Sequence, residues 1–168
     1  MNRILYYILW VLCFSFSACI ADDEETSEGN NLMVGNRIPT FSVVMNDGSK
    51  VQDKDLLGKV SLIVFFHTDC RDCQQELPVL QRFYDTHPQY PIICISRGQS
   101  AESVAQYWEQ ASLTLPYSAQ DNRDIYHLFA NQGIPRIYVV DREGIIRTLF
   151  TDNPLATYED LLNKASAL

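Results

Sequence analysis

The chain has 168 residues and a formal net charge of −8 at neutral pH. This length allows one domain of ordinary size plus some additional sequence, and it excludes a second large domain. Five of the 21 acidic residues and one of the 13 basic residues lie before residue 32, so the remainder has 16 acids, 12 bases and a net charge of −4. Because this remainder is mildly acidic and lacks a cluster of lysine and arginine, we expect no nucleic-acid partner.

Residues 1–18 have the layout of a secretory signal peptide. A positive residue, Arg3, precedes an apolar run over Ile4–Phe16, and small residues follow at Ser17 and Ala18. The apolar run is too short to span a membrane comfortably. We therefore expect a cleaved signal peptide, and an uncleaved N-terminal anchor helix remains the alternative.

The residues around Cys19 resemble a bacterial lipobox, in which the cysteine becomes the lipidated first residue of the mature protein. Ser17-Ala18-Cys19 fits this pattern, whereas Phe16 stands where the pattern prefers leucine. The resemblance implies a lipid anchor on Cys19. Ordinary cleavage after Ala21 is the alternative.

A polar segment separates Cys19 from the folded part of the chain. The acidic run Asp22–Glu25 is followed by polar residues up to Asn31, which cannot bury enough apolar surface to order themselves. We expect a lipidated cysteine and flexible acidic tether over 19–36 and a folded domain over 37–168. The acidic run resembles the surface-export mark of some Gram-negative lipoproteins. It implies the cell envelope of a Gram-negative-type bacterium, with the domain at the periplasmic face or the cell surface.

A hairpin and a buried strand open the predicted domain. The apolar segment Phe41–Met45 precedes Asn46-Asp47-Gly48, a strong signal for a tight turn. Val60–Phe66 is nearly all apolar, which is typical of a strand that is covered on both faces. This segment is the predicted central strand.

Helices and further strands alternate after the central strand. Apolar residues at three- and four-residue spacing predict a helix over Cys70–Tyr84, kinked at Pro78. The remaining predicted elements are strands over Pro91–Ser96, Arg136–Asp141 and Ile145–Phe150, and helices over Ala101–Ala111, Asp124–Ala130 and Thr157–Ala167. This order predicts an α/β fold in which a central sheet has helices on both faces.

Cys70 and Cys73 form a CxxC motif where the central strand gives way to a helix. One helical turn separates the two residues, so their sulfurs can form a disulfide, and unpaired N–H groups at the helix start favour a thiolate at Cys70. We expect Cys70 to attack and Cys73 to resolve the mixed disulfide. A zinc site would need a second pair of ligands at suitable spacing, so we expect no metal. The other cysteine and the histidines of the domain are scattered: Cys94, His67, His87 and His127.

From about Arg37 to Leu168 the chain resembles the TlpA/ResA-type branch of the thioredoxin superfamily. The matching pieces are Phe65-Phe66-His67-Thr68-Asp69-Cys70-Arg71-Asp72-Cys73, Glu76-Leu77-Pro78 and Gly133-Ile134-Pro135. The resemblance implies a thioredoxin-like fold with a central mixed sheet and an N-terminal β-hairpin extension. It also implies a thiol:disulfide oxidoreductase that uses Cys70 and Cys73 as a redox-active disulfide and needs no cofactor.

The same resemblance implies roles for three further residues. A cis peptide at Ile134–Pro135 should face the CxxC motif, where the backbone pairs with a bound partner; an ordinary proline at a strand start is the alternative. Glu76 should serve in proton transfer to Cys73. Since its helix is mostly covered, a raised carboxyl pKa would suit that role, and a solvated acid in the first turn is the alternative.

Several residues near the motif depart from the family pattern or carry no assigned role. Asp69 stands where family members usually have tryptophan, and its charge opposes ionisation of Cys70 while Arg71 favours it. His67 is expected to be a surface or packing residue. Cys94 lies in the middle of an apolar run and is expected in the core.

The expected function is therefore thiol:disulfide exchange outside the cytoplasm. We expect a monomer, held at the membrane by its lipid anchor, that reduces disulfides of exported proteins with electrons from a membrane thiol or electron donor. One alternative is a peroxiredoxin-like thiol peroxidase, for which Thr68 is present but a proline before Cys70 is missing. The other is a non-catalytic thioredoxin-fold lipoprotein, whose mark would be the loss of the two cysteines.

Overall fold

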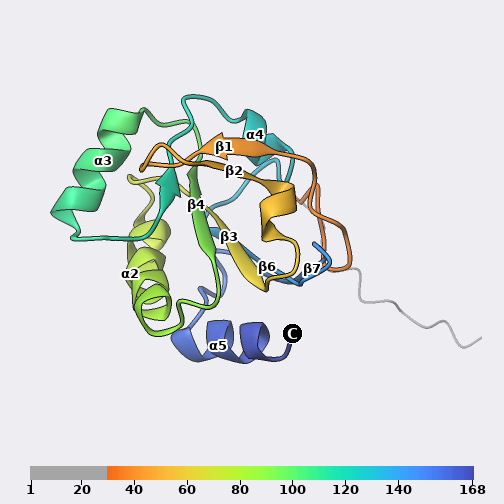
Figure 1. Cartoon of the computed structure of the whole chain (residues 1–168). Helices are drawn as coiled ribbons and strands as arrows, with labels where there is room; N and C mark the ends of the chain where they lie inside the picture. Colours follow the sequence, from red (N-terminus) through yellow and green to blue (C-terminus); the bar gives the residue numbers. More distant parts are fainter. Residues whose placement is uncertain (1–29) are drawn as a thin grey trace, which may run out of the picture.

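A computed structural model describes residues 30–168 of the chain (Figure 1). The predicted signal peptide, the lipidation of Cys19 and the acidic run lie outside these described residues. Between residues 30 and 168, no helix has the length and apolar character needed to cross a membrane.

The predicted hairpin forms a small sheet of its own. Strand β1 (Ser42–Val44) pairs antiparallel with β2 (Lys50–Gln52), with Val43 opposite Val51. Gly48 has φ of 83° in the turn between them, a conformation that glycine adopts without strain. A short 3-10 helix, η1 (Asp53–Leu56), follows and was not predicted.

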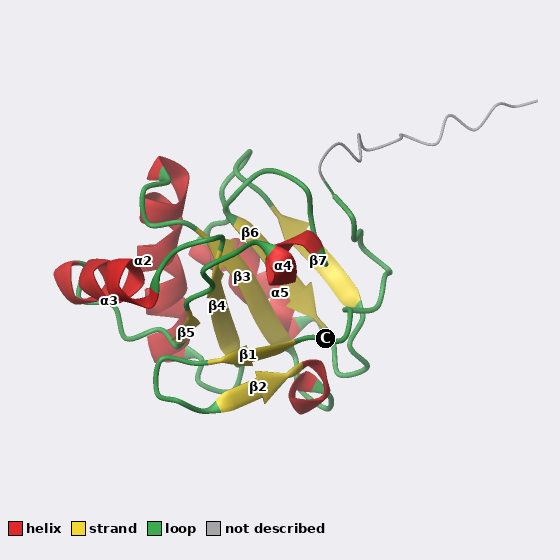
Figure 2. Cartoon of the chain, turned by 90° about the horizontal axis from the view of Figure 1, so that it is seen from above, coloured by secondary structure: helices red, strands yellow, loops and turns green. Residues whose placement is uncertain are grey.

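A five-stranded mixed sheet forms the centre of the domain (Figure 2). Its spatial order is β5-β4-β3-β6-β7; β3, β4 and β5 run parallel, and β6 and β7 are antiparallel to their neighbours. The strands are β3 (Ser61–Phe66), β4 (Ile92–Ser96), β5 (Tyr117–Ser118), β6 (Arg136–Val140) and β7 (Ile146–Phe150). The prediction of a central mixed sheet is confirmed, although β5 was missed because two residues carry no periodic signal.

Helices cover both faces of this sheet. The helices are α2 (Arg71–Thr86), α3 (Ala101–Gln110), α4 (Asp124–His127) and α5 (Tyr158–Ser166). Helices α2, α3 and α5 lie on one face and the one-turn α4 on the other (Figure 2). Helix α2 continues through Pro78, which is exposed, as one helix to Thr86.

Neighbouring residues of β3 show how the two faces are filled. Side chains alternate along a strand, so Phe65 and Phe66 point to opposite faces. Phe66 contacts Trp108 of α3, with ring centroids 4.8 Å apart. Phe65 contacts Tyr126 of α4 at 5.5 Å and Phe129 at 4.9 Å, and all of these rings except Trp108 are fully buried. This aromatic packing fixes the end of β3 from which the CxxC motif follows.

The described part of the predicted tether is attached to the domain. The N–H of Leu32 donates to the carbonyl of Phe129 at 3.0 Å, and the N–H of Gly35 donates to the carbonyl of Ile146 at 2.8 Å. Residues 30–36 therefore lie against α4 and the edge strand β7.

Candidate active site

Cys70 caps the N-terminus of α2. Its backbone is extended, and its Sγ accepts a hydrogen bond from the N–H of Cys73 at 3.3 Å. This N–H belongs to the first turn of the helix, where backbone donors have no partner within the helix. The structure thus places Cys70 where a sulfur that gains negative charge is stabilised by the helix terminus.

Cys73 lies one turn deeper and is buried. Burial raises the pKa of the Cys73 thiol well above its usual range, and the hydrogen bond with Cys70 raises it further. Cys70 is partly accessible, and both thiols are free in this structure. Because only the thiolate is a good nucleophile, this difference in burial suits an accessible attacking thiol and a protected second thiol.

The segment Gly133-Ile134-Pro135 lies directly against Cys70. The Cys70 thiol donates to the carbonyl of Ile134 at 3.6 Å, although the two residues are 64 positions apart. The Ile134–Pro135 peptide is cis. Tyr126 donates from its hydroxyl to the carbonyl of Gly133 at 2.8 Å, so α4 supports this segment from behind. The structure therefore brings together Cys70, Cys73, Ile134 and Pro135.

A buried amide supports the loop before the motif and was missed in the sequence. The side chain of Gln99 accepts from the N–H of Thr68 at 2.8 Å and donates to the Thr68 hydroxyl at 2.7 Å. Gln74 donates to the Thr68 carbonyl at 2.7 Å. The N–H, hydroxyl and carbonyl of Thr68 are thus all hydrogen-bonded, and these bonds position the loop that leads to Cys70. Nothing in the local sequence distinguishes Gln99 from an ordinary polar residue of a connection.

Glu76 is buried at the sheet side of α2, one turn after Cys73. Its Oε2 accepts from the N–H of Ala156, before α5, at 3.2 Å, whereas its Oε1 is buried without a hydrogen-bond partner among the described residues. Burial raises the pKa of Glu76 to about 7, and the hydrogen bond from Ala156 partly opposes this shift. The hydrogen bond of this carboxyl thus joins α2 to the segment before α5. The role of Glu76 in proton transfer to Cys73 stays a prediction.

Replacing Glu76 by glutamine is expected to remove a pH dependence of stability. The folded-state pKa lies above the ordinary value of 4.5, so the buried carboxyl stabilises the fold fully below about pH 4.5, and this stability is lost as pH rises through 7. At pH 8 the Glu76→Gln variant should be more stable by about 3 kcal/mol, since the pKa is raised from 4.5 to about 7 and each pKa unit corresponds to 1.36 kcal/mol. Urea unfolding at pH 5 and pH 8 measures this difference.

The matched control is Glu102→Gln, which alters an exposed acid at the start of α3. Its stability should follow the wild-type pH profile. Equal slopes for the Glu76 variant and the wild type between pH 5 and pH 8 would contradict the shifted pKa.

The residues that depart from the family pattern take different positions. The side chain of Asp69 is 88% exposed, and its carboxylate lies 3.8 Å from Nδ1 of His67. His67 is half-buried, and this burial lowers its pKa. Cys94 is fully buried in β4, as expected for a core residue, and burial raises its pKa.

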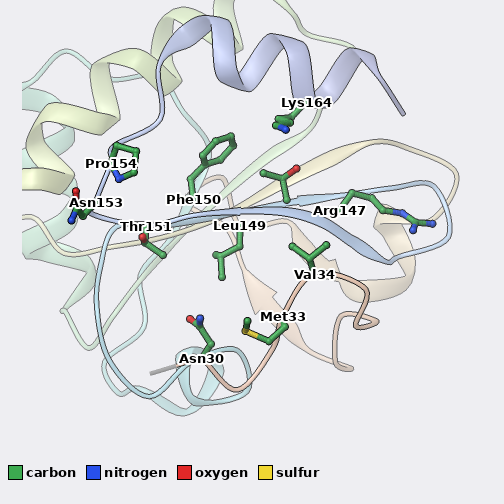
Figure 3. A pocket seen from close by; sticks show the side chains of 11 residues that line it. Asn30, Met33, Val34, Arg147, Leu149, Phe150, Thr151, Asn153, Pro154 and Lys164 are labelled. Atoms are coloured by element: carbon green, nitrogen blue, oxygen red, sulfur yellow. The ribbon is translucent and has the colours of Figure 1, made fainter. Parts of the chain in front are cut away.

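One of the surface hollows lies beside the motif, and a larger one lies away from it. A polar hollow of about 280 Å³ is lined by Thr68, Asp69, Gln99, Tyr107 and neighbouring polar residues of α3. A larger hollow of about 570 Å³ runs along the edge strand β7 and shares no residue with the redox pair (Figure 3). Throughout residues 30–168, no group of three His, Cys, Asp or Glu side chains is arranged to hold a metal ion.

Comparison with known sequences identifies a family and named relatives. Residues 34–149 match the model of the AhpC/TSA family. The chain is 24% identical over 168 residues to the thiol-disulfide oxidoreductase ResA of Bacillus thuringiensis, covering 97% of this chain and 96% of that protein. It is 21% identical over 153 residues to ResA of Bacillus subtilis, covering 88% and 82%.

Solved structures share the fold. A solution structure from Bacteroides thetaiotaomicron, proposed to be a protein disulfide isomerase, has a TM-score of 0.75 and 26% identity, covering 83% of this chain and 90% of that chain. A secreted disulfide oxidoreductase of Mycobacterium tuberculosis, described as homologous to Escherichia coli DsbE, has a TM-score of 0.68 and 17% identity, covering 76% and 96%.

Proposed function

Because the chain belongs to the AhpC/TSA family and is a TlpA/ResA-like, thioredoxin-fold thiol:disulfide oxidoreductase, we propose that it reduces disulfides of exported proteins through Cys70 and Cys73. The observation that carries this proposal is the position of Cys70. Its sulfur caps α2, accepts the N–H of Cys73 at 3.3 Å and lies 3.6 Å from the Ile134 carbonyl.

The exchange proceeds in two steps. The Cys70 thiolate attacks one sulfur of the partner's disulfide, forming a mixed disulfide and releasing the other partner sulfur as a thiolate. Cys73 then loses its proton and attacks Cys70, which forms the Cys70–Cys73 disulfide and releases the second partner thiolate. Two electrons pass to the partner in each cycle, so a dithiol donor must reduce the pair again.

The buried residues around the pair serve this exchange. The Ile134 carbonyl beside Cys70 offers a backbone acceptor to an extended partner segment that crosses Pro135. Glu76 has a pKa of about 7 and so can both accept and release a proton near neutral pH, which suits transfer of the Cys73 proton through an intervening water. Both assignments are part of the proposal.

The proposed location is the cell envelope. The N-terminal pattern of Arg3, the apolar run and Cys19 supports export and lipid anchoring. The proposed electron source is a membrane thiol or electron donor, and the proposed direction is reduction of the partner. The peroxidase and non-catalytic alternatives are not favoured, since the named relatives are thiol-disulfide oxidoreductases.

The reduction potential tests this function. We expect the full-length protein, purified in non-ionic detergent, to show a reversible Cys70–Cys73 couple below about −200 mV, since thioredoxin-like reductants lie near −270 mV. Equilibration in thiol/disulfide buffers, followed by alkylation and mass spectrometry, measures the potential. A value near −120 mV would make the protein a disulfide donor, and the absence of a reversible couple would refute the oxidoreductase mechanism.

A further inference from the structure

Two arginines lie at the rim of the redox site. Arg97 follows β4 directly, and its N–H donates to the carbonyl of Phe66, the last residue of β3, at 2.9 Å. Arg123 precedes α4, and its Cγ lies 3.4 Å from the position of a Cβ on Gly98. Burial lowers the pKa of His67; the charge of Asp69 opposes this shift, and the charges of both arginines add to it. Both guanidinium groups are therefore within electrostatic range of the loop that leads to Cys70.

Arg97 is also linked to the segment that faces Cys70. Its Cζ lies 5.3 Å from the ring centroid of Tyr126. The hydroxyl of Tyr126 holds the carbonyl of Gly133 at 2.8 Å, and the next carbonyl, that of Ile134, lies 3.6 Å from the Cys70 sulfur. Arg97 is thus connected through Tyr126 to the segment that faces Cys70.

Neither arginine has a carboxylate partner within residues 30–168. The ion pairs of this region are His67–Asp69 and Asp141–Arg147, so the acid next to Cys70 contacts His67 and leaves the arginines unpaired. The Nε of Arg97 is buried and has no hydrogen-bond acceptor there. Because this Nε is closed to a partner, a carboxylate would bind the terminal N–H groups of the guanidinium, which have no acceptor among the described residues.

We propose that Arg97, with Arg123 beside it, recognises a carboxylate that flanks the disulfide of the partner protein. This inference rests on the proposed function and adds a substrate class to it: exported proteins whose reactive cysteine has an aspartate or glutamate close in sequence. Charge complementarity at the rim of an interface mainly speeds association and selects partners. The arginines therefore act mainly on the choice of partner.

Three matched disulfide peptides test this inference. They differ only in the residues that flank one cysteine, which are glutamate, glutamine or lysine. The reduced full-length protein in non-ionic detergent should react about fivefold faster with the glutamate peptide than with the lysine peptide at low salt, a preference that fades at about 0.5 M salt. Stopped-flow fluorescence measures the second-order rate constants.

Variants assign the preference to Arg97. Arg97→Gln should reduce the ratio to below about twofold, and Arg97→Lys should keep part of it because the charge remains. Lys50→Gln removes one positive charge from the exposed strand β2 and should leave the fivefold ratio intact. Because each ratio is taken within one protein, a change in rate that is common to all three peptides cancels from it.

Two results would overturn the inference while the proposed function stands. One is an unchanged ratio with unchanged rates in Arg97→Gln. The other is an unchanged ratio with an equal slowing of all three peptides, which would assign Arg97 to support of the Gly133 segment alone. A wild-type protein without a reversible Cys70–Cys73 couple would instead remove the proposed function and this inference with it.

Discussion

Replacing Cys70 by serine should lower the rate of thiol exchange at least about a thousandfold, because a hydroxyl supplies no thiolate at neutral pH. Cys70 is the redox residue that is partly accessible, whereas Cys73 is buried. No other described thiol can take its place, since Cys94 is enclosed in β4. Reduction of a small disulfide substrate, followed with a thiol reagent, measures the loss.

The Cys73→Ser variant should behave differently from Cys70→Ser. It retains the attacking sulfur, so it should complete the first step and then accumulate a mixed disulfide that mass spectrometry detects under non-reducing conditions. Cys94→Ala is the matched control, because it removes a cysteine from the core and leaves the helix start intact. It should retain exchange. Turnover by Cys70→Ser, or wild-type turnover by Cys73→Ser, would contradict the two-step mechanism.

Replacing Phe65 by alanine should lower the free energy of unfolding by about 3 to 5 kcal/mol. Phe65 is fully buried in the central strand, and its ring contacts Tyr126, Phe129 and Tyr138 at centroid distances of 4.9 to 6.1 Å. Alanine leaves a cavity among three rings that cannot all collapse into it. Denaturant unfolding at constant pH measures the loss.

Val44→Ala is the reference for this experiment. Val44 also lies in a strand, but it is 61% exposed, so its truncation should change stability by no more than about 0.5 kcal/mol. A loss below about 1 kcal/mol in Phe65→Ala would mean that the aromatic layer rearranges to fill the space. Tyr126 would then shift as well, and its hydrogen bond to the Gly133 carbonyl would be weakened.

The Cys70 and Phe65 experiments separate the chemistry from the scaffold. A cysteine variant should lose exchange with little change in stability, because Cys70 lies at the surface end of α2. The Phe65 variant should lose stability first, and its exchange should decline as the segment opposite Cys70 becomes less well held. The same aromatic layer thus supports both the core and the site.

The sequence by itself determined those features that depend on residues close together in the chain. The turn at Asn46-Asp47-Gly48 predicted the hairpin, the apolar run predicted β3, and the CxxC after it predicted a helix that begins at the motif. Each of these signals is local: a turn type, a burial pattern or a helix terminus is specified within a few residues. Element boundaries differed by only a few residues; α4, for example, forms a single turn and ends three residues earlier than predicted.

Only the tertiary structure decided which distant groups meet. Ile134 reaches Cys70 across 64 positions, Gln99 reaches Thr68 across 31, and Ala156 reaches Glu76 across 80. Strand order, connection lengths and packing set these contacts, and hydrophobic periodicity contains none of that information. The cis peptide that faces the CxxC motif was expected from resemblance to a family. The hydrogen bond between Glu76 and Ala156, and the position of Arg97 over Tyr126 without a carboxylate partner among residues 30–168, had no counterpart in the sequence. These features arise because the strand order and the connections between strands bring distant segments together, which no local pattern specifies.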